Sequence, residues 1–134
     1  MSAISDAGGA FFQNARETKD YEERLDAGQL PIVRGLERSA EDDLRRAVIQ
    51  SLMCRMKLDL DQLEETFGRD DLAEYFAAEW QELQPLADEG FCTLADRRVL
   101  VQPRGRLFLR HMAMVFDAYL CDEKPDGPRF SQTV

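Results

Sequence analysis

The chain has 134 residues, of which 44% are hydrophobic and 32% charged, a composition that fits one globular domain with a packed core and excludes two full domains. Its net charge of -9 at pH 7 repels phosphate backbones at long range and argues against generic nucleic-acid binding, although a local basic patch would escape that repulsion. No stretch approaches the roughly 18 uninterrupted apolar residues that cross a bilayer, so we expect a cytoplasmic protein that binds no membrane.

The N-terminal segment joins small residues to apolar ones. Gly8 and Gly9 are followed by Phe11 and Phe12 before any helical pattern begins. The segment lacks the basic start and the apolar run of a secretory signal, and a polar tail would hold no adjacent phenylalanines. We therefore expect a flexible, half-apolar start that requires a separate explanation.

A mostly polar helix is predicted next. Asn14 and Glu17 form a capping-box pattern, and Gly28 marks the C-terminal stop. The small number of apolar side chains places this helix on the outside of a larger structure. Pro31 and Gly35 then forbid a continuous helix, so we expect an extended linker up to the next element.

Two amphipathic helices follow the linker. Ser39 opens the first, with Asp42 at the capping position, and apolar side chains then recur at three- and four-residue intervals. These apolar positions are Leu44, Val48, Ile49, Leu52, Met53 and Met56. A shorter helix over residues 58–67 is predicted to end at Gly68.

The longest helical pattern covers residues 69–90. It starts with acidic residues, carries one apolar face, and should bend near its end at Pro85. Two short β-rich runs come next, and we expect Phe91–Leu94 to pair with Val99–Gln102 as a hairpin.

A final helix is predicted from Arg106 to Leu120. Its apolar side chains point in almost every direction, so this helix must be covered all round. One solution is a central helix wrapped by the others. The other solution is contact with a second domain or self-association with a second copy of the chain.

The order of three helices, a hairpin and a closing helix is that of a winged-helix domain. The predicted fold class is therefore mainly α, a winged-helix-like helical domain with one β-hairpin, preceded by a helical linker. DNA readers of this shape present basic or amide side chains from the third helix, whereas the helix from Asp71 carries mostly carboxylates. We interpret these carboxylates as an ordinary solvated surface, not as an acid–base pair, and we expect no nucleic-acid partner.

The sequence contains no pattern typical of a metal site or of a catalytic nucleophile. Cys54, Cys92 and Cys121 are odd in number, far apart and without a Cys-x-x-Cys pair, which is typical of reduced thiols packed as small hydrophobic side chains. His111 is the only histidine, and we interpret it as a helix residue and not as a ligand. The sequence also lacks a glycine-rich phosphate loop and a Ser/His/Asp signature.

Five blocks of sequence carry a family resemblance. They are SAEDDLRRAVIQSLMC, LDLDQLEETFG, LAEYFAAEWQELQPLADEGF, GRLFLRHMAMVFDAYL and the terminal RFSQTV. In order and spacing they resemble the C-terminal part of oxygen-independent coproporphyrinogen III oxidase, a radical S-adenosylmethionine enzyme of haem (porphyrin) biosynthesis. The resemblance implies that residues 1–38 hold the end of the catalytic barrel pattern and a linker helix, and that residues 39–134 form the C-terminal winged-helix-like domain.

The resemblance implies an oxidoreductase activity that this chain alone should lack. The family oxidatively decarboxylates two propionate side chains of coproporphyrinogen III to give protoporphyrinogen IX. It uses S-adenosylmethionine and a [4Fe-4S] cluster held by a Cys-x-x-x-Cys-x-x-Cys motif, which the three distant cysteines of this chain cannot form. We therefore expect a truncated, inactive chain that binds neither cofactor by itself.

Partners and one binding residue follow from the same resemblance. Ile4 matches the family position that contacts the second S-adenosylmethionine. The radical-SAM barrel would cover the apolar start of the chain and part of the last helix, and the helical domain would help to hold coproporphyrinogen III. Near the C-terminus, Gln132 stands where the family commonly has an arginine, whose charge glutamine cannot replace.

Two other functions stay open at this point. A stand-alone winged-helix-like module would bind a protein partner through its last helix, and a nucleic-acid-binding regulator ranks third. Only an oxidase domain should restore decarboxylation when a barrel is added, whereas DNA binding should be sensitive to salt.

Overall fold

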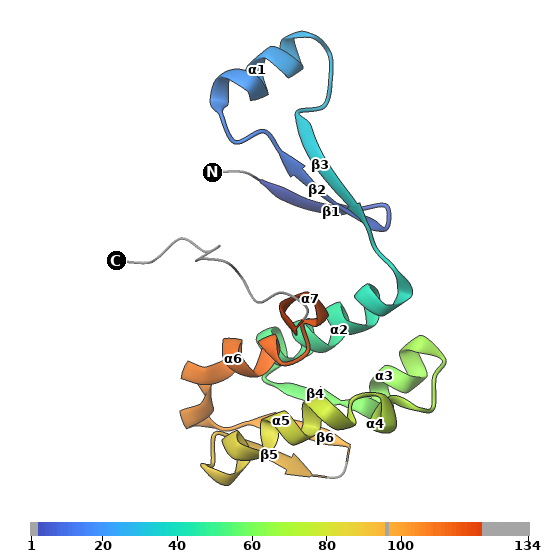
Figure 1. Ribbon diagram of the computed structural model, residues 1–134, viewed down its shortest axis with the longest axis vertical. Coiled ribbons are helices and arrows are strands. Elements are labelled where there is room, and N and C mark those ends of the chain that lie inside the picture. The colour runs from blue at the N-terminus through green and yellow to red at the C-terminus, as the bar shows by residue number, and fades with distance from the viewer. Residues whose placement is uncertain (1–2, 96, 122–134) are drawn as a thin grey trace. The chain divides into compact units, whose positions relative to one another are not determined.

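The computed structural model describes residues 3–95 and 97–121. The chain divides into a first unit, Met1–Asp43, and a second unit, Leu44–Val134. Helices dominate and the strands are antiparallel, so the predicted mainly α fold class with a β-hairpin is confirmed (Figure 1). The likeness to a winged-helix domain stays a prediction, as does the assignment of residues 1–38 and 39–134 to separate domains.

An antiparallel sheet forms most of the first unit, where the sequence patterns predict none. Its strands lie in the order β1-β2-β3, with bounds Ile4–Ala7, Ala10–Asn14 and Ile32–Glu37. Gly8 and Gly9 form the tight turn between β1 and β2 with φ values of 59° and 80°, which glycine adopts without steric cost. The expected flexible start is therefore wrong, and the expected linker is extended but paired as β3.

The helix of the first unit is shorter than predicted. Helix α1 covers Thr18–Asp26, and its N-cap is Glu17, which makes no side-chain capping bond. Asn14 is instead the last residue of β2 and lies opposite Ile32, so the capping box predicted at Asn14 is wrong. The stop at Gly28 is confirmed by its φ of 69°, and no residue of α1 is buried, as its polar composition predicts.

The second unit holds most of the helices. Their bounds are α2 Ala40–Arg55, which begins before the unit boundary, α3 Leu60–Phe67, α4 Leu72–Tyr75, α5 Ala77–Asp88, the 3-10 helix η1 Pro103–Phe108, α6 Leu109–Met114 and α7 Ala118–Cys121. The cap predicted for α2 is confirmed, because the hydroxyl of Ser39 accepts the backbone amide of Asp42 at 3.1 Å and the backbone amide of Ser39 donates to the side chain of Asp42 at 2.8 Å. Gly68 ends α3 in the left-handed conformation, also as predicted.

Both long helices predicted for this unit are broken. The pattern over residues 69–90 divides at Phe76, whose ring is fully buried, into α4 and α5. The predicted final helix divides into η1, α6 and α7. Amides of Phe116 and Asp117 donate to carbonyls three residues back and so end α6. The side chain of Asp117 then accepts the amide of Tyr119 at 3.1 Å and starts α7.

A small sheet closes the second unit. The predicted hairpin exists, shifted by one residue, as β5 Cys92–Ala95 and β6 Arg98–Val101. A further strand, β4 Lys57–Asp59, pairs with the other edge of β6 and gives the order β4-β6-β5. This third strand is not predicted from the sequence.

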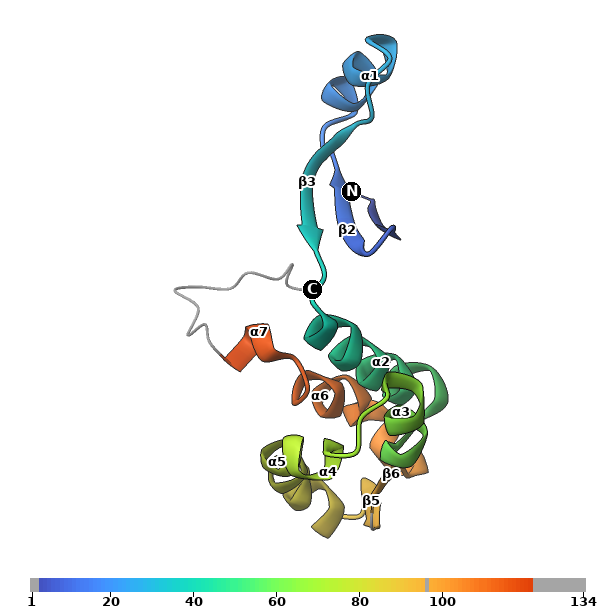
Figure 2. The same cartoon turned by 90° about the vertical axis from the view of Figure 1, so that its right-hand side faces the viewer.

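The core of the second unit lies between α2, the broken helices and this sheet. Helices α2 and α6 lie side by side in both views (Figures 1 and 2). The largest fully buried side chains are Leu44, Val48, Leu52, Leu58, Leu60, Leu72, Phe76, Leu83, Val99, Met112 and Phe116. The rings of Phe76 and Phe116 meet edge to face with centroids 5.5 Å apart. Within the described residues, no helix combines the length and apolar character of a membrane span.

Candidate functional site

One face of the first sheet carries an apolar hollow. The strand register places Ile4 opposite Gln13 and Phe11 opposite Leu36, so these side chains share a face, which we call the Ile4 face. Ile4 is 71% exposed and Leu36 is 52% exposed. Together with Phe12, Arg34 and Gly35 they line a hollow of about 320 Å³. So much exposed apolar surface on three strands indicates a contact site.

Arg38 joins β1 to the start of α2 on the same side of the sheet as the Ile4 face. It donates to Asp6 of β1 and, at 2.6 Å, to Asp43. Its guanidinium carbon lies 5.1 Å from the ring centroid of Phe11. The hydrogen bonds that Arg38 donates to Asp43 and then to Asp6 raise the pKa of Arg38 above its usual value. The Ile4 face is therefore held in a set arrangement before any partner binds.

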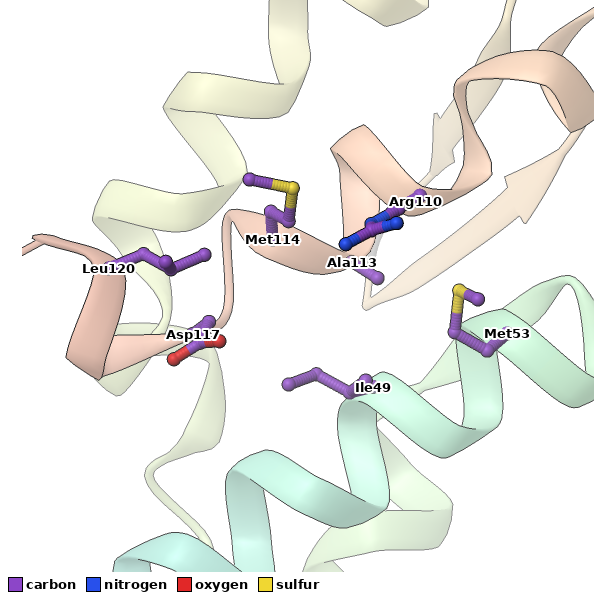
Figure 3. A pocket seen from close by; sticks show the side chains of 7 residues that line it. All are labelled: Ile49, Met53, Arg110, Ala113, Met114, Asp117 and Leu120. Atoms are coloured by element: carbon purple, nitrogen blue, oxygen red, sulfur yellow. The ribbon is translucent and has the colours of Figure 1, made fainter. Parts of the chain in front are cut away.

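The second unit has a groove of its own between α2 and the segment from α6 to α7, which we call the α2–α6 groove (Figure 3). It has a volume of about 210 Å³ and is lined by Ile49, Met53, Arg110, Ala113, Met114, Asp117 and Leu120. Arg110 lies near Met53 at one end, and Asp117 lies with Leu120 at the other. The groove thus combines apolar walls with one cation and one carboxylate, a lining that suits an apolar group with charged substituents.

An ion pair joins α2 to α5 in the same unit. Arg45 of α2 donates to Glu79 of α5 at 3.0 Å and to the carbonyl of Phe116 at 3.1 Å. The exposed fractions of the two charged side chains are only 17% and 14%. Glu79 is therefore not the solvated surface carboxylate expected from the sequence, because it is largely shielded and pairs with Arg45.

The cysteines whose side chains the structure describes, Cys54 and Cys92, do not form a metal site. Cys54 is exposed on α2, whereas Cys92 is buried on β5, where burial raises the pKa of its thiol. The side chain of Cys121 and the residues around Gln132 lie outside the described part of the chain. Among the described side chains, including the exposed His111, no group of three or more metal-binding residues gathers. The residues of this chain do not fit a [4Fe-4S] cluster, for which closely spaced thiolates are needed.

A protein-family model matches the core region of this chain. Residues 39–108 match the family model described as the HemN C-terminal domain. The chain belongs to the HemN C-terminal domain family. The match runs from the capping serine of α2 through η1, so it covers most of the elements that form the core of the second unit, while Met112 of α6 and Phe116 lie beyond it.

Relatives of this HemN C-terminal domain extend the match over the whole chain. Over all 134 residues it is 41% identical to the oxygen-independent coproporphyrinogen III oxidase of Pseudomonas aeruginosa and covers 28% of that protein. It is 37% identical, over all 134 residues, to the protein of the same name from Salmonella typhimurium and covers 29% of it. The chain therefore spans less than a third of these relatives.

A solved structure shows the same fold. Coproporphyrinogen III oxidase (HemN) from Escherichia coli, described as a radical SAM enzyme, matches with a TM-score of 0.80 and 36% identity. The match covers 88% of this chain and 27% of that protein. The resemblance stated from the sequence is thus confirmed at the level of the family and of the fold.

The site residues divide into expected and unexpected ones. Ile4, the one binding residue carried over from the resemblance, lies on an exposed apolar face, and its contact with a cofactor stays a prediction. The α2–α6 groove is not predicted, because its walls come from segments about sixty residues apart in the sequence. The signal present in the sequence is the excess of apolar residues in the final helical stretch, some of which line this groove.

Proposed function

We propose that this chain acts as the C-terminal domain of a cytoplasmic, oxygen-independent coproporphyrinogen III oxidase and packs against a radical S-adenosylmethionine barrel. The observation that carries the proposal is the match of the whole chain to enzymes of that name, of which it spans less than a third. The remainder of such an enzyme would hold the [4Fe-4S] cluster, which the residues of this chain do not fit.

The Ile4 face is the surface that we assign to the barrel. Its apolar side chains are exposed in a sheet whose first strand, β1, pairs only with β2 among the described residues. An open strand edge beside an exposed apolar face is suited to pairing with, and being covered by, further strands. In the assembled enzyme Ile4 would contribute an apolar contact to the second S-adenosylmethionine.

The role of this domain in catalysis would be to bind the substrate and to enclose it. The cluster and S-adenosylmethionine supply the radical that abstracts hydrogen when they are bound to the barrel. The helices of the second unit would cover the bound coproporphyrinogen III and keep water from the radical, while their exposed side chains orient the substrate. No proton transfer is assigned to a residue of this chain.

Association in trans tests the proposal. A fragment of the Pseudomonas aeruginosa relative that lacks the segment matching this chain should bind the 134-residue chain with micromolar affinity. The mixture should also convert coproporphyrinogen III to protoporphyrinogen IX, which neither part does alone. Ile4→Asp combined with Leu36→Asp should weaken association at least about tenfold, because each buries a charge in an apolar contact.

The matched control is Leu30→Asp, which adds the same charge at a side chain that is 73% exposed and lies outside the Ile4 face. It should leave association unchanged. Absence of association at about 50 µM would refute the proposal. Equal weakening by the control and by the Ile4-face variants would refute the assignment of the face.

A further inference from the structure

A cationic segment runs through η1 and α6, from Pro103 to Met114. It contains Arg104, Arg106, Arg110 and His111 and no carboxylate, in a chain whose net charge is -9. Such a concentration of one sign against the overall charge creates a local positive potential. The many apolar residues of this stretch do not explain why it also carries three arginines.

These arginines differ from others in the same unit. Arg45, Arg69, Arg97 and Arg98 each pair with a carboxylate. By contrast, Arg104, Arg106 and Arg110 are exposed and make no ion pair with any carboxylate that the structure describes. Their charges are thus available to an anion from outside.

Exposed apolar side chains lie next to these cations. Leu107 is 91% exposed and Met114 is 40% exposed. Arg106 and Leu107 lie on the 3-10 helix η1, and Arg110 and Met114 lie one turn apart on α6, which follows directly. We call these four residues the Arg106 face. Arg110 and Met114 also line the α2–α6 groove, so the face continues into an apolar hollow (Figure 3).

An aromatic platform borders the face. The rings of Phe91 and Phe108 lie with centroids 4.4 Å apart, and the guanidinium carbon of Arg104 lies 5.7 Å from the ring centroid of Phe91. Phe108 is 40% exposed, so part of this stack is open to a ligand. This contact with the Phe91 ring holds Arg104 next to the Arg106 face and does not use the hydrogen-bond donors of its guanidinium.

We infer that the Arg106 face binds the propionate carboxylates of the tetrapyrrole substrate, with Leu107 and Met114 against its apolar ring system. This inference rests on the proposed function and adds the residues that would recognise the substrate. Guanidinium groups match carboxylates in charge and in planar geometry, and each such contact is a charge-assisted hydrogen bond. A nucleic acid would meet the same arginines but also the repulsion of an acidic chain.

Binding of coproporphyrin III, the oxidised and fluorescent counterpart of the substrate, tests this inference on the 134-residue chain. Arg106→Gln combined with Arg110→Gln should weaken binding at least about tenfold, because two charge-assisted contacts are lost. Mesoporphyrin IX, a porphyrin with fewer carboxylates, should bind more weakly to the wild-type chain and be less affected by the substitutions. The control is Arg55→Gln combined with Lys57→Gln, which removes the same charge at exposed positions of α2 and β4.

Equal weakening by the two double variants would overturn the inference, since only the net charge would then matter. Unchanged binding in the Arg106→Gln and Arg110→Gln variant would overturn it as well. If the same variant lost association with the barrel but bound porphyrin normally, the inference would also be overturned, because the face would then be a protein interface. Absence of barrel association in the wild-type chain refutes the proposed function, whereas absence of porphyrin binding with association intact refutes only the Arg106 face.

Discussion

Nη1 of Arg45 on α2 lies 3.0 Å from Oε1 of Glu79 on α5, and both side chains are largely shielded from water. The same nitrogen donates to the carbonyl of Phe116, just beyond α6. The guanidinium carbon lies 5.5 Å from the ring centroids of both Tyr75 and Phe76. One side chain therefore joins three segments of the second unit, and its removal leaves a shielded carboxylate and a carbonyl without this donor.

Arg45→Ala should lower the free energy of unfolding by about 2–4 kcal/mol, because breaking one partner of a shielded pair leaves the other uncompensated. Urea denaturation followed by circular dichroism measures this change. Arg55→Ala, at the exposed end of the same helix, should change the value by less than about 0.5 kcal/mol. Similar values for the two variants would contradict the role of the ion pair.

Among the described glycines, Gly105 is the least able to accept a side chain. A Cβ there would lie 1.9 Å from the carbonyl oxygen of Phe91 and 3.2 Å from Cε of Met112. Gly105→Ala should therefore destabilise the chain by more than about 3 kcal/mol or prevent folding, because backbone atoms cannot move aside cheaply. The neighbouring Leu107→Ala, at an exposed site, should leave the thermal midpoint almost unchanged. Equal thermal midpoints for Gly105→Ala and wild type would show that the two backbones do not approach in this way.

The two described cysteines should react with iodoacetamide at very different rates. Cys54 is exposed, whereas Cys92 is buried and burial raises the pKa of its thiol, so little reactive thiolate forms near neutral pH. Mass spectrometry of the native chain should find Cys54 alkylated first and Cys92 only after urea is added. Early alkylation of Cys92 would mean that β5 does not bury it in solution.

Asp71 should stabilise the fold at neutral pH but not in acid. Two hydrogen bonds of 2.7 Å from Arg69 lower the pKa of Asp71 below its usual range. Because the folded pKa is lower than the unfolded one, the stabilisation is present above the unfolded value and is lost as pH falls through the folded value. Asp71→Asn should thus be less stable than wild type near neutral pH, and the difference should shrink below about pH 4.

Urea titrations at several pH values measure this difference, which should also decrease with added salt because the pair is partly exposed. Asp70→Asn, which removes the same charge one residue away, is the matched control. A constant difference between Asp71→Asn and wild type from neutral pH to acid would contradict the lowered pKa.

Local signals predict much of the second unit. The spacing of apolar residues in α2, the cap formed by Ser39 and Asp42, and the stop at Gly68 all act within a few residues, so the sequence alone displays them. The hairpin of β5 and β6 belongs to the same class, because its strands are adjacent in the chain. Each of these features is confirmed.

Features that depend on distant contacts are missed. Strand β2 pairs with β3 across the whole of α1, and Asn14 resembles a helix cap while it ends a strand. Helices α4 and α5 separate where Phe76 turns into the core, which depends on Phe116 forty residues later. The Ile4 face and the α2–α6 groove arise from the same kind of distant pairing, so only the resemblance pointed to Ile4 and no local pattern pointed to the groove.

The position of β6 in its sheet sets the order in which the second unit can assemble. It is the middle strand, yet it follows β4 and β5 in the chain. During synthesis β4 therefore leaves the ribosome before its partner strand β6 has been made. The apolar side chains of α2 likewise stay exposed until Val99, Met112 and Phe116 have been synthesised and can pack in the core. The local β5–β6 hairpin should close first and capture β4 afterwards, since the longer loop costs more entropy to close. The nascent chain thus exposes an open strand and an unfilled core until residues near Phe116 emerge, a period in which chaperones would protect it from aggregation.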